Sequence, residues 1–198
     1  MEEAQPIRPA ATVVLTRALP GGGHQVLMGQ RGAGAAFMPS KYVFPGGGVD
    51  AGDDFAGPLP LPDDCARRLA LAGPPGPLVA AALRELAEET GLALRADRPV
   101  MRFVFRAITP PGRSRRFDAR FFLADAADAS GDAEGFSAAS AELSHLHWIG
   151  LAEARALDLP FVTEVVLAEV TNLLAGGTQP GVPFFDNSGP VPTFRRIV

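Results

Sequence analysis

The sequence predicts a mixed α+β fold, in which a sheet is sandwiched between helices. Predicted strands outnumber predicted helices and are interleaved with them irregularly, which is typical of a mixed sheet rather than a regular parallel one. Apolar residues make up 47% of the 198 residues and charged residues 20%. This balance is ample for a buried core and excludes disorder of the whole chain. We expect a single domain over residues 1–198.

Short β-branched or alternating apolar segments bounded by glycine and proline predict the strands. A hairpin is expected first, because the turn Pro20–Gly23 separates two such segments. The predicted strands are Ala10–Arg17, Gln25–Gln30, Val100–Ile108, Arg116–Ala124 and Leu143–Ile149.

Helical periodicity is clearest in Leu78–Thr90, which Gly91 ends at the position of a left-handed cap. Two more helices, Leu151–Ala156 and Val162–Leu174, are predicted near the end of the chain. Residues 54–77 are proline-rich and form a predicted insertion with one short helix, Asp63–Ala72. Residues 125–140 are predicted as loop, and residues 176–198 as an extended tail.

Charge and cysteine content exclude several classes of function. The net charge of −4 argues against a general nucleic-acid surface, which needs a basic excess. A single cysteine, Cys65, cannot form an intramolecular disulfide, so a reducing cytoplasm is the expected compartment. The N-terminus has no apolar segment typical of a signal peptide, and no apolar run approaches the ~20 residues of a membrane helix.

Three carboxylates gather on one face of the predicted helix Leu78–Thr90. Glu85, Glu88 and Glu89 lie opposite the apolar side chains of that helix, because spacings of three and four residues share a face. Like charges at this spacing repel one another, and a divalent cation such as Mg²⁺ or Mn²⁺ reverses that effect. An ordinary solvated helix face is the alternative.

The segment Phe44–Asp53 contains four glycines and two aspartates. A backbone with so few side chains can approach a ligand closely and offer amides to a phosphate and a carbonyl to a metal ion. Taken alone, the segment is equally consistent with a tight turn.

Together the two segments resemble the box of the Nudix hydrolase family, G-x5-E-x7-R-E-U-x-E-E-x-G-U, where U is bulky and apolar. The second half is complete from Arg84 to Leu92, and the first half is Gly47 followed by five residues and Asp53 in place of glutamate. About 23 extra residues separate the halves. The resemblance implies an α/β/α sandwich with a mixed central sheet, carrying in addition the helical insertion and C-terminal helices.

The resemblance also implies roles for residues of the box. Glu85, Glu88 and Glu89 would ligate Mg²⁺ or Mn²⁺ with the carbonyl of Gly46, and Arg84 would orient the glutamates as an ion-pair partner. A metal-activated water would attack a diphosphate phosphorus. Glu142 is our candidate for a catalytic base from a later loop, with Glu134 as the alternative; both are equally consistent with surface residues.

A branch of the family that includes coenzyme A diphosphatases of the peroxisomal type has an insertion in the same place. In this branch the segment before the box resembles Arg31 to Gly47 of this chain. A second group of coenzyme A hydrolases has a related segment with an added arginine and glycine. This chain has Ala36 and Ser40 at those two positions, so it lacks the motif of the second group. The expected substrate is therefore coenzyme A or acyl-coenzyme A. The residues expected to contact this substrate are Arg31, Gly47, Arg116 and Arg120. The alternative is that the arginines are solvent-facing strand residues and that Gly47 belongs to a tight turn.

Three further interpretations stay open. The box recognises a diphosphate and not what is attached to it, so ADP-ribose, a dinucleotide or a nucleotide sugar is an alternative substrate. Some proteins with this fold bind nucleotides without hydrolysing them, although such proteins generally lack box glutamates that this chain keeps. The expected partner is a small nucleotide-derived molecule, with no nucleic acid and no membrane, and homodimer formation is left open.

Overall fold

The computed structural model describes residues 5–198 and contains every predicted strand and helix, together with strands that were not predicted. The strands are β1 (Ile7–Ala18), β2 (His24–Arg31), β3 (Tyr42–Val43), β4 (Gly46–Gly48), β5 (Ala93–Leu94), β6 (Met101–Ile108), β7 (Arg116–Asp125), β8 (Ala129–Ser130), β9 (Leu143–Gly150), β10 (Val182–Asp186) and β11 (Thr193–Ile197). The helices are α1 (Asp63–Ala70), α2 (Pro75–Thr90), α3 (Leu151–Ala154) and α4 (Phe161–Leu174), with a 3₁₀ turn η1 at Ala126–Asp128.

The central sheet is mixed, as predicted. Its strand order is β11-β10-β6-β7-β1-β2-β3, with β9 paired to β2 and β4 paired to β1. Strand β1 runs parallel to β7, and β10 runs parallel to β6, whereas the other pairs are antiparallel. Parallel pairs need long crossovers, and the chain supplies them as helix-containing segments.

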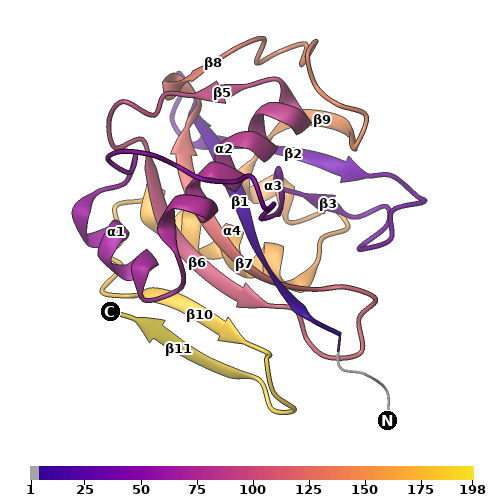
Figure 1. The fold of residues 1–198 in the computed structure, drawn as a ribbon. Helices are drawn as coiled ribbons and strands as arrows, with labels where there is room; N and C mark the ends of the chain where they lie inside the picture. The colour runs from indigo at the N-terminus through magenta and orange to yellow at the C-terminus, as the bar shows by residue number, and fades with distance from the viewer. Residues whose placement is uncertain (1–4) are drawn as a thin grey trace.

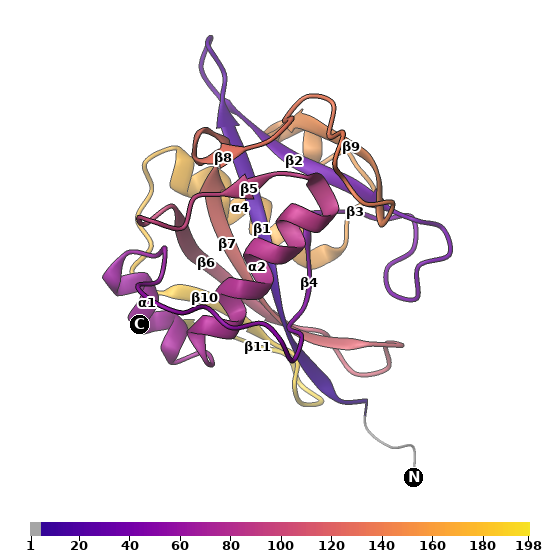
Figure 2. The same ribbon diagram turned by 45° about the horizontal axis from the view of Figure 1, so that its top comes forward.

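Helices cover both faces of this sheet, which confirms the predicted sandwich. Helix α2 lies across one face and α4 across the other (Figures 1 and 2). Leu86 of α2 packs with Phe103 in one buried cluster, and Val166 of α4 packs with Phe105 in the second. The middle of β1 is buried on both sides for this reason, and it reads as a continuous apolar run instead of an alternating one.

Strand β1 has two different neighbours along one edge. Its residues Ala10–Thr12 pair with β4, and its residues Thr16–Ala18 pair with β2. The glycine strand β4 is thereby held against the first half of β1, under helix α2. This arrangement brings the two halves of the box together in space.

The predicted insertion is packed onto the fold. Helix α1 buries Cys65 and Leu69 in the same cluster as α2. Helix α2 begins at Pro75, three residues before the predicted start, because proline lacks the N–H that the first helical turn leaves without an acceptor. The helix ends at Gly91 with φ 73°, as predicted.

The predicted tail and loop contain strands that the sequence analysis did not identify. Strands β10 and β11 form a hairpin within residues 176–198, and β10 extends the sheet beyond β6. Residues 125–140 include η1 and the short strand β8, which pairs with β5. No helix within residues 5–198 combines the length and the apolar character that crossing a bilayer requires.

Candidate active site

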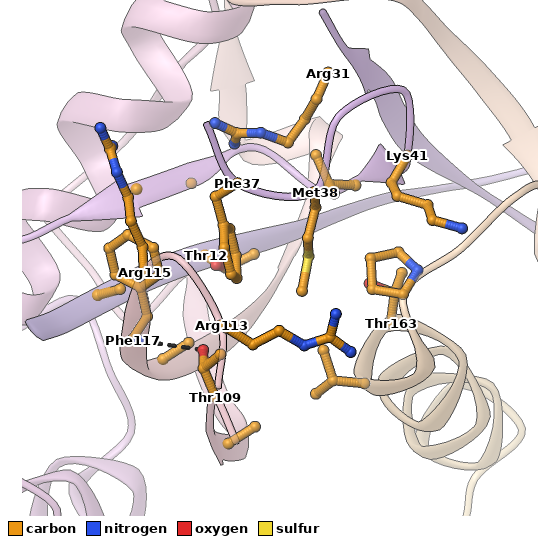
Figure 3. A pocket seen from close by; sticks show the side chains of 18 of the residues that line it. Thr12, Arg31, Phe37, Met38, Lys41, Thr109, Arg113, Arg115, Phe117 and Thr163 are labelled. Atoms are coloured by element: carbon orange, nitrogen blue, oxygen red, sulfur yellow. Dashed lines mark hydrogen bonds between the residues drawn. The ribbon is translucent and has the colours of Figure 1, made fainter. Parts of the chain in front are cut away.

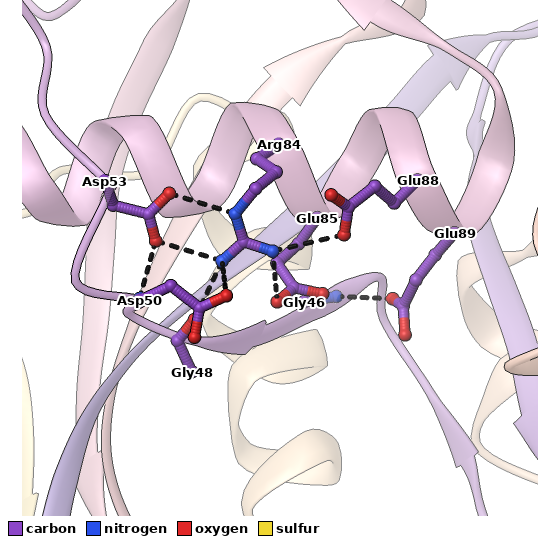
Figure 4. Close-up of polar contacts among 8 residues, drawn as sticks. All are labelled: Gly46, Gly48, Asp50, Asp53, Arg84, Glu85, Glu88 and Glu89. Carbon is purple, nitrogen blue, oxygen red and sulfur yellow. Dashed lines mark hydrogen bonds and ion pairs between the residues drawn. The ribbon is translucent and has the colours of Figure 1, made fainter.

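The acidic face of α2 lies directly over the glycine strand (Figure 4). The backbone N–H of Gly46 donates a hydrogen bond to Glu89 Oε2 over 2.8 Å. Glu89 is almost completely buried, with 2% of its surface exposed. Glycine is required here because a Cβ at Gly46 would lie 2.5 Å from the carbonyl oxygen of Ala11 in β1. The close approach of strand and helix therefore depends on the missing side chains.

Arg84 joins the two halves of the box across the insertion. Its Nε and Nη2 donate to Asp53 Oδ1 and Oδ2, each over 2.9 Å, and Nη2 also donates to the carbonyl of Gly48 over 3.0 Å. The fork of the guanidinium matches a carboxylate in this two-bond geometry. Aspartate thus fills the place of the usual glutamate, and its contact with Arg84 lowers its pKa below the ordinary value.

The other side of the Arg84 guanidinium faces the glutamates. Its Nη1 donates to Glu85 Oε1 over 2.9 Å and to Glu88 Oε2 over 3.1 Å. Hydrogen bonds to Asp53 and Glu85 raise the pKa of Arg84, so the guanidinium stays charged. Arg84 therefore contacts two of the three carboxylates. The positioning role that the family resemblance implies for it stays a prediction.

Replacing Asp53 by asparagine is expected to destabilise the protein by ~1.5–3 kcal/mol at pH 7, the range for hydrogen bonds to a charged group. The folded-state pKa of Asp53 is lowered, so its contribution is complete above its unfolded value of about 3.9 and is lost as the pH falls below it. Urea unfolding of both proteins between pH 7 and pH 3 should show the difference narrowing in acid. Asp50→Asn is the matched control, since Asp50 is 77% exposed and 3.7 Å from Arg84. If the free energy of unfolding fell equally in both variants, the role of Asp53 would be contradicted.

Burial disfavours the ionised forms of the carboxylates of Glu89 and Glu85. It raises the pKa of Glu89 to about 8, although the Gly46 N–H lowers it in part. Burial also raises the pKa of Glu85, opposed by its hydrogen bond and ion pair with Arg84. Two buried carboxylates side by side disfavour their own ionised forms, and a cation bound between them would favour those forms.

In residues 5–198 no three histidine, cysteine or carboxylate side chains stand arranged to hold a metal ion. The reason is local, because Glu85 and Glu88 turn toward Arg84 while Glu89 turns toward Gly46. Joint ligation of one ion would require Glu85 and Glu88 to turn away from Arg84. Glu88 is the freer of the two, with 57% of its side chain exposed against 13% for Glu85.

A cavity of about 980 Å³ opens beside these groups (Figure 3). Most of the predicted site residues line its wall, and Glu142 is close enough to raise the pKa of Glu89 through charge repulsion. The predicted residues in the wall are Gly46, Gly47, Glu85, Glu89, Arg31 and Glu142. Glu134, the alternative base, lies outside the wall and forms an ion pair with Arg17.

Arg31 brings a positive charge to the same wall. Its charge lowers the pKa of Glu89, which places the guanidinium near the buried carboxylate. The Nε of Arg31 is buried and has no hydrogen-bond partner among residues 5–198. An acceptor on a bound ligand would satisfy this donor.

Arg116 and Arg120 do not fit their predicted role as substrate contacts. Both are buried outside the cavity wall, with 8% and 4% of their surfaces exposed. Arg116 donates to the carbonyls of Thr109, Asn187 and Ser188, whereas Arg120 pairs with Asp118 and donates to the carbonyl of Ala72. The two side chains lie on the same face of β7, because they are four residues apart on a strand. Arg116 contacts the C-terminal tail, and Arg120 contacts the insertion.

Arg113 and Arg115 also line the cavity wall, on the loop between β6 and β7. They belong to the arginine-rich segment Arg113–Arg120, which together with Arg106 of the preceding strand contains five arginines. The sequence offers these arginines either as contacts for a substrate with several phosphates or as a solvated basic edge of a hairpin. Other residues of the wall were not predicted. The start of α4, at Phe161–Thr163, and two residues of the tail, Phe185 and Asn187, also line the wall. No local sequence signal marks these last positions, because only the packing of α4 and β10 brings them to the cavity.

The comparisons with known proteins agree with this arrangement. The sequence model of the NUDIX domain matches residues 75–170, from the start of α2 into α4. The crystal structure of a NUDIX hydrolase from Alicyclobacillus acidocaldarius is similar at 25% identity and TM-score 0.61, with 83% of this chain and 90% of that chain covered. No curated protein matches the chain.

Two solved structures with named ligands or substrates share the fold. An Ap4A hydrolase from C. elegans is 20% identical with TM-score 0.54, over 86% of this chain and 99% of that chain. The NUDIX domain of Shewanella oneidensis NrtR, solved with ADP ribose, is 17% identical with TM-score 0.58, over 86% and 90%. At these identities the similarity establishes the fold alone.

Proposed function

We propose that this chain, a Nudix hydrolase with its domain match over residues 75–170, hydrolyses a nucleoside diphosphate linked to a second moiety and requires a divalent metal ion. The observation that carries the proposal is the arrangement in Figure 4, where Arg84 joins Asp53 to Glu85 and Glu88 while Glu89 meets Gly46. This arrangement gathers three carboxylates beside a cavity large enough for a nucleotide derivative.

The residues present fit a hard divalent cation. Mg²⁺ and Mn²⁺ prefer oxygen ligands, and helix α2 supplies three carboxylates, those of Glu85, Glu88 and Glu89. The raised pKa values of Glu85 and Glu89 support this assignment, since burial disfavours the charge of both carboxylates and a bound cation would favour it. We propose the carbonyl of Gly46 as an additional ligand. When bound, the ion would lower the pKa of a water molecule and neutralise charge on phosphoryl oxygens.

The chain's own groups have distinct proposed tasks around the reacting phosphorus. Arg84 lies outside the cavity wall, so it positions Glu85 and Glu88 without contacting the substrate. Glu142 accepts the proton of the attacking water, because it lies in the cavity wall near Glu89 and is not held by an ion pair among residues 5–198. Arg31 and the backbone at Gly47 contact the diphosphate, and the unpartnered Nε of Arg31 supports this role.

Coenzyme A or an acyl derivative is the proposed substrate. Two observations favour it over ADP-ribose, a dinucleotide or a nucleotide sugar. The insertion lies between Asp53 and Arg84, and the lead-in from Arg31 to Gly47 forms part of the cavity wall. Cleavage of the diphosphate would give 3′,5′-ADP and a 4′-phosphopantetheine product.

A substrate panel tests this assignment. We expect kcat/KM to be higher for coenzyme A and acetyl-coenzyme A than for the other substrates of the panel. Those are ADP-ribose, NADH, diadenosine polyphosphates, UDP-glucose and dNTPs, and each substrate is measured with Mg²⁺ and with Mn²⁺. If ADP-ribose or a nucleotide sugar leads coenzyme A by about tenfold, equal to ~1.4 kcal/mol, the coenzyme A assignment is wrong and the diphosphatase proposal remains.

A further inference from the structure

The arginine-rich segment divides into internal and cavity-facing members. Arg106 pairs with Asp118 through two hydrogen bonds of 2.8 Å, and Arg120 pairs with the same carboxylate over 2.9 Å. Arg116 is engaged by three backbone carbonyls. Three of the five arginines are therefore used by the fold itself.

Arg113 and Arg115 are the remaining two, and both lie in the wall of the cavity. Both are exposed, and neither forms an ion pair with a carboxylate of residues 5–198. In the view of Figure 3 they extend from the β6–β7 loop, with Phe37 and Met38 between that loop and Arg31. An uncompensated pair of guanidiniums beside a cavity favours an anionic group within it.

The loop that carries the two arginines is anchored at both ends. Thr109 N donates to the carbonyl of Phe117 over 2.8 Å, and Ser114 Oγ donates to the carbonyl of Ala36 over 2.8 Å. The rings of Phe37 and Phe117 meet edge to face at 5.2 Å. The backbone around Arg113 and Arg115 is thus fixed relative to the segment that leads into the glycine strand.

Side chains of both charges line the cavity. The wall carries the carboxylates of Glu85, Glu89 and Glu142 as well as the guanidiniums of Arg113 and Arg115. Of the arginines in the wall, Arg31 acts on the pKa of Glu89. A volume of about 980 Å³ lies at the upper end of the range for small-molecule sites, so a diphosphate alone would leave much of it empty. The wall can therefore hold a second charged group of the same ligand.

We infer that Arg113 and Arg115 form a subsite for a phosphoryl group that the substrate carries in addition to its diphosphate. This inference rests on the proposed hydrolase site and assigns its specificity. Guanidiniums suit this task because their N–H groups match phosphoryl oxygens. The subsite selects phosphorylated nucleosides over their counterparts without the extra phosphate.

Pairs of substrates that differ by one phosphate provide the test. Coenzyme A is compared with dephospho-coenzyme A, and NADPH with NADH, in the wild type and in the double variant Arg113→Gln/Arg115→Gln. The variant is expected to lower kcat/KM for the phosphorylated member by about tenfold or more, the fold-change for losing a charge-assisted hydrogen bond. The other member of each pair should change by less than about threefold, so the preference collapses.

The control is Arg95→Gln/Arg155→Gln, which removes the same charge from two exposed positions outside the cavity wall. It should keep the wild-type preference, and Arg113→Lys/Arg115→Lys should keep part of it. Equal losses for both members of a pair in the cavity variant would overturn the subsite. So would a control that loses the preference to the same extent.

A binding measurement separates this inference from the proposed function. Calorimetric titration with 3′,5′-ADP and with AMP needs no turnover, and the wild type is expected to bind 3′,5′-ADP more tightly by about tenfold. The cavity variant should bind the two nucleotides equally. If no diphosphate is cleaved, the hydrolase proposal fails while this comparison still decides the subsite; equal binding of both nucleotides by the wild type would overturn it.

Discussion

Replacing Glu89 by glutamine is expected to lower kcat by at least ~100-fold, the magnitude for losing a group that positions a metal ion and its water. Glutamine keeps the shape of the side chain and can still accept the hydrogen bond from the Gly46 N–H, which spans 2.8 Å in the wild type. Only the charge is removed. Steady-state rates with saturating Mg²⁺ measure the effect.

The Glu89→Gln variant should be folded, and the pH dependence of its free energy of unfolding tests this. The folded-state pKa of Glu89 is raised to about 8, so in the metal-free wild type the charged carboxylate destabilises the fold increasingly as pH rises from about 4.5 toward 8. Glutamine carries no charge, so the variant does not lose stability in this way. Its free energy of unfolding at pH 8 in EDTA should be at least as high as that of the wild type. Glu134→Gln, at a side chain 76% exposed and paired with Arg17, is the control and should keep the wild-type rate. A near-normal rate for Glu89→Gln would remove the role assigned to this carboxylate.

Alanine at Gly47 is expected to lower kcat/KM by about tenfold or more while the free energy of unfolding changes little. The added Cβ would stand 2.5 Å from Glu85 Cδ, so the carboxylate must move out of its position. The clash falls on the end of a flexible side chain and not on backbone, which confines the damage to the site. A positional error of this size is sufficient to lose ~10–100-fold in rate.

Gly48→Ala is the matched control for this prediction. Gly48 belongs to the same strand, but its added Cβ would meet nothing nearer than 4.0 Å. Rates and urea unfolding are measured for both variants. A Gly47→Ala enzyme as active as Gly48→Ala would show that the position of Glu85 does not matter.

Local patterns predicted most of the fold because the deciding interactions are local. The apolar runs of β1, β6 and β7 and the cap at Gly91 each appear within a dozen residues of sequence. The hairpin of β10 and β11 was missed because its strand residues are few and stand among proline and glycine. Its place is set by pairing with β6, more than 70 residues earlier, and no local signal carries that information.

The box glutamates were identifiable because their spacing on one helix follows from helical geometry. The contacts of Arg84 with Asp53 across the insertion agree with the predicted continuity of the box. The arginines that line the cavity were not identifiable in the same way. Arg113, Arg115, Arg116 and Arg120 look equivalent in sequence, and only strand alternation and burial separate the cavity-facing pair from the structural pair.

The most direct test of the central claim is the initial rate of diphosphate hydrolysis in EDTA, followed by addition of excess Mg²⁺ or Mn²⁺. If the carboxylates of α2 carry a catalytic divalent ion, the rate should fall to background in EDTA and return when the metal is restored. Full turnover in EDTA would contradict the claim.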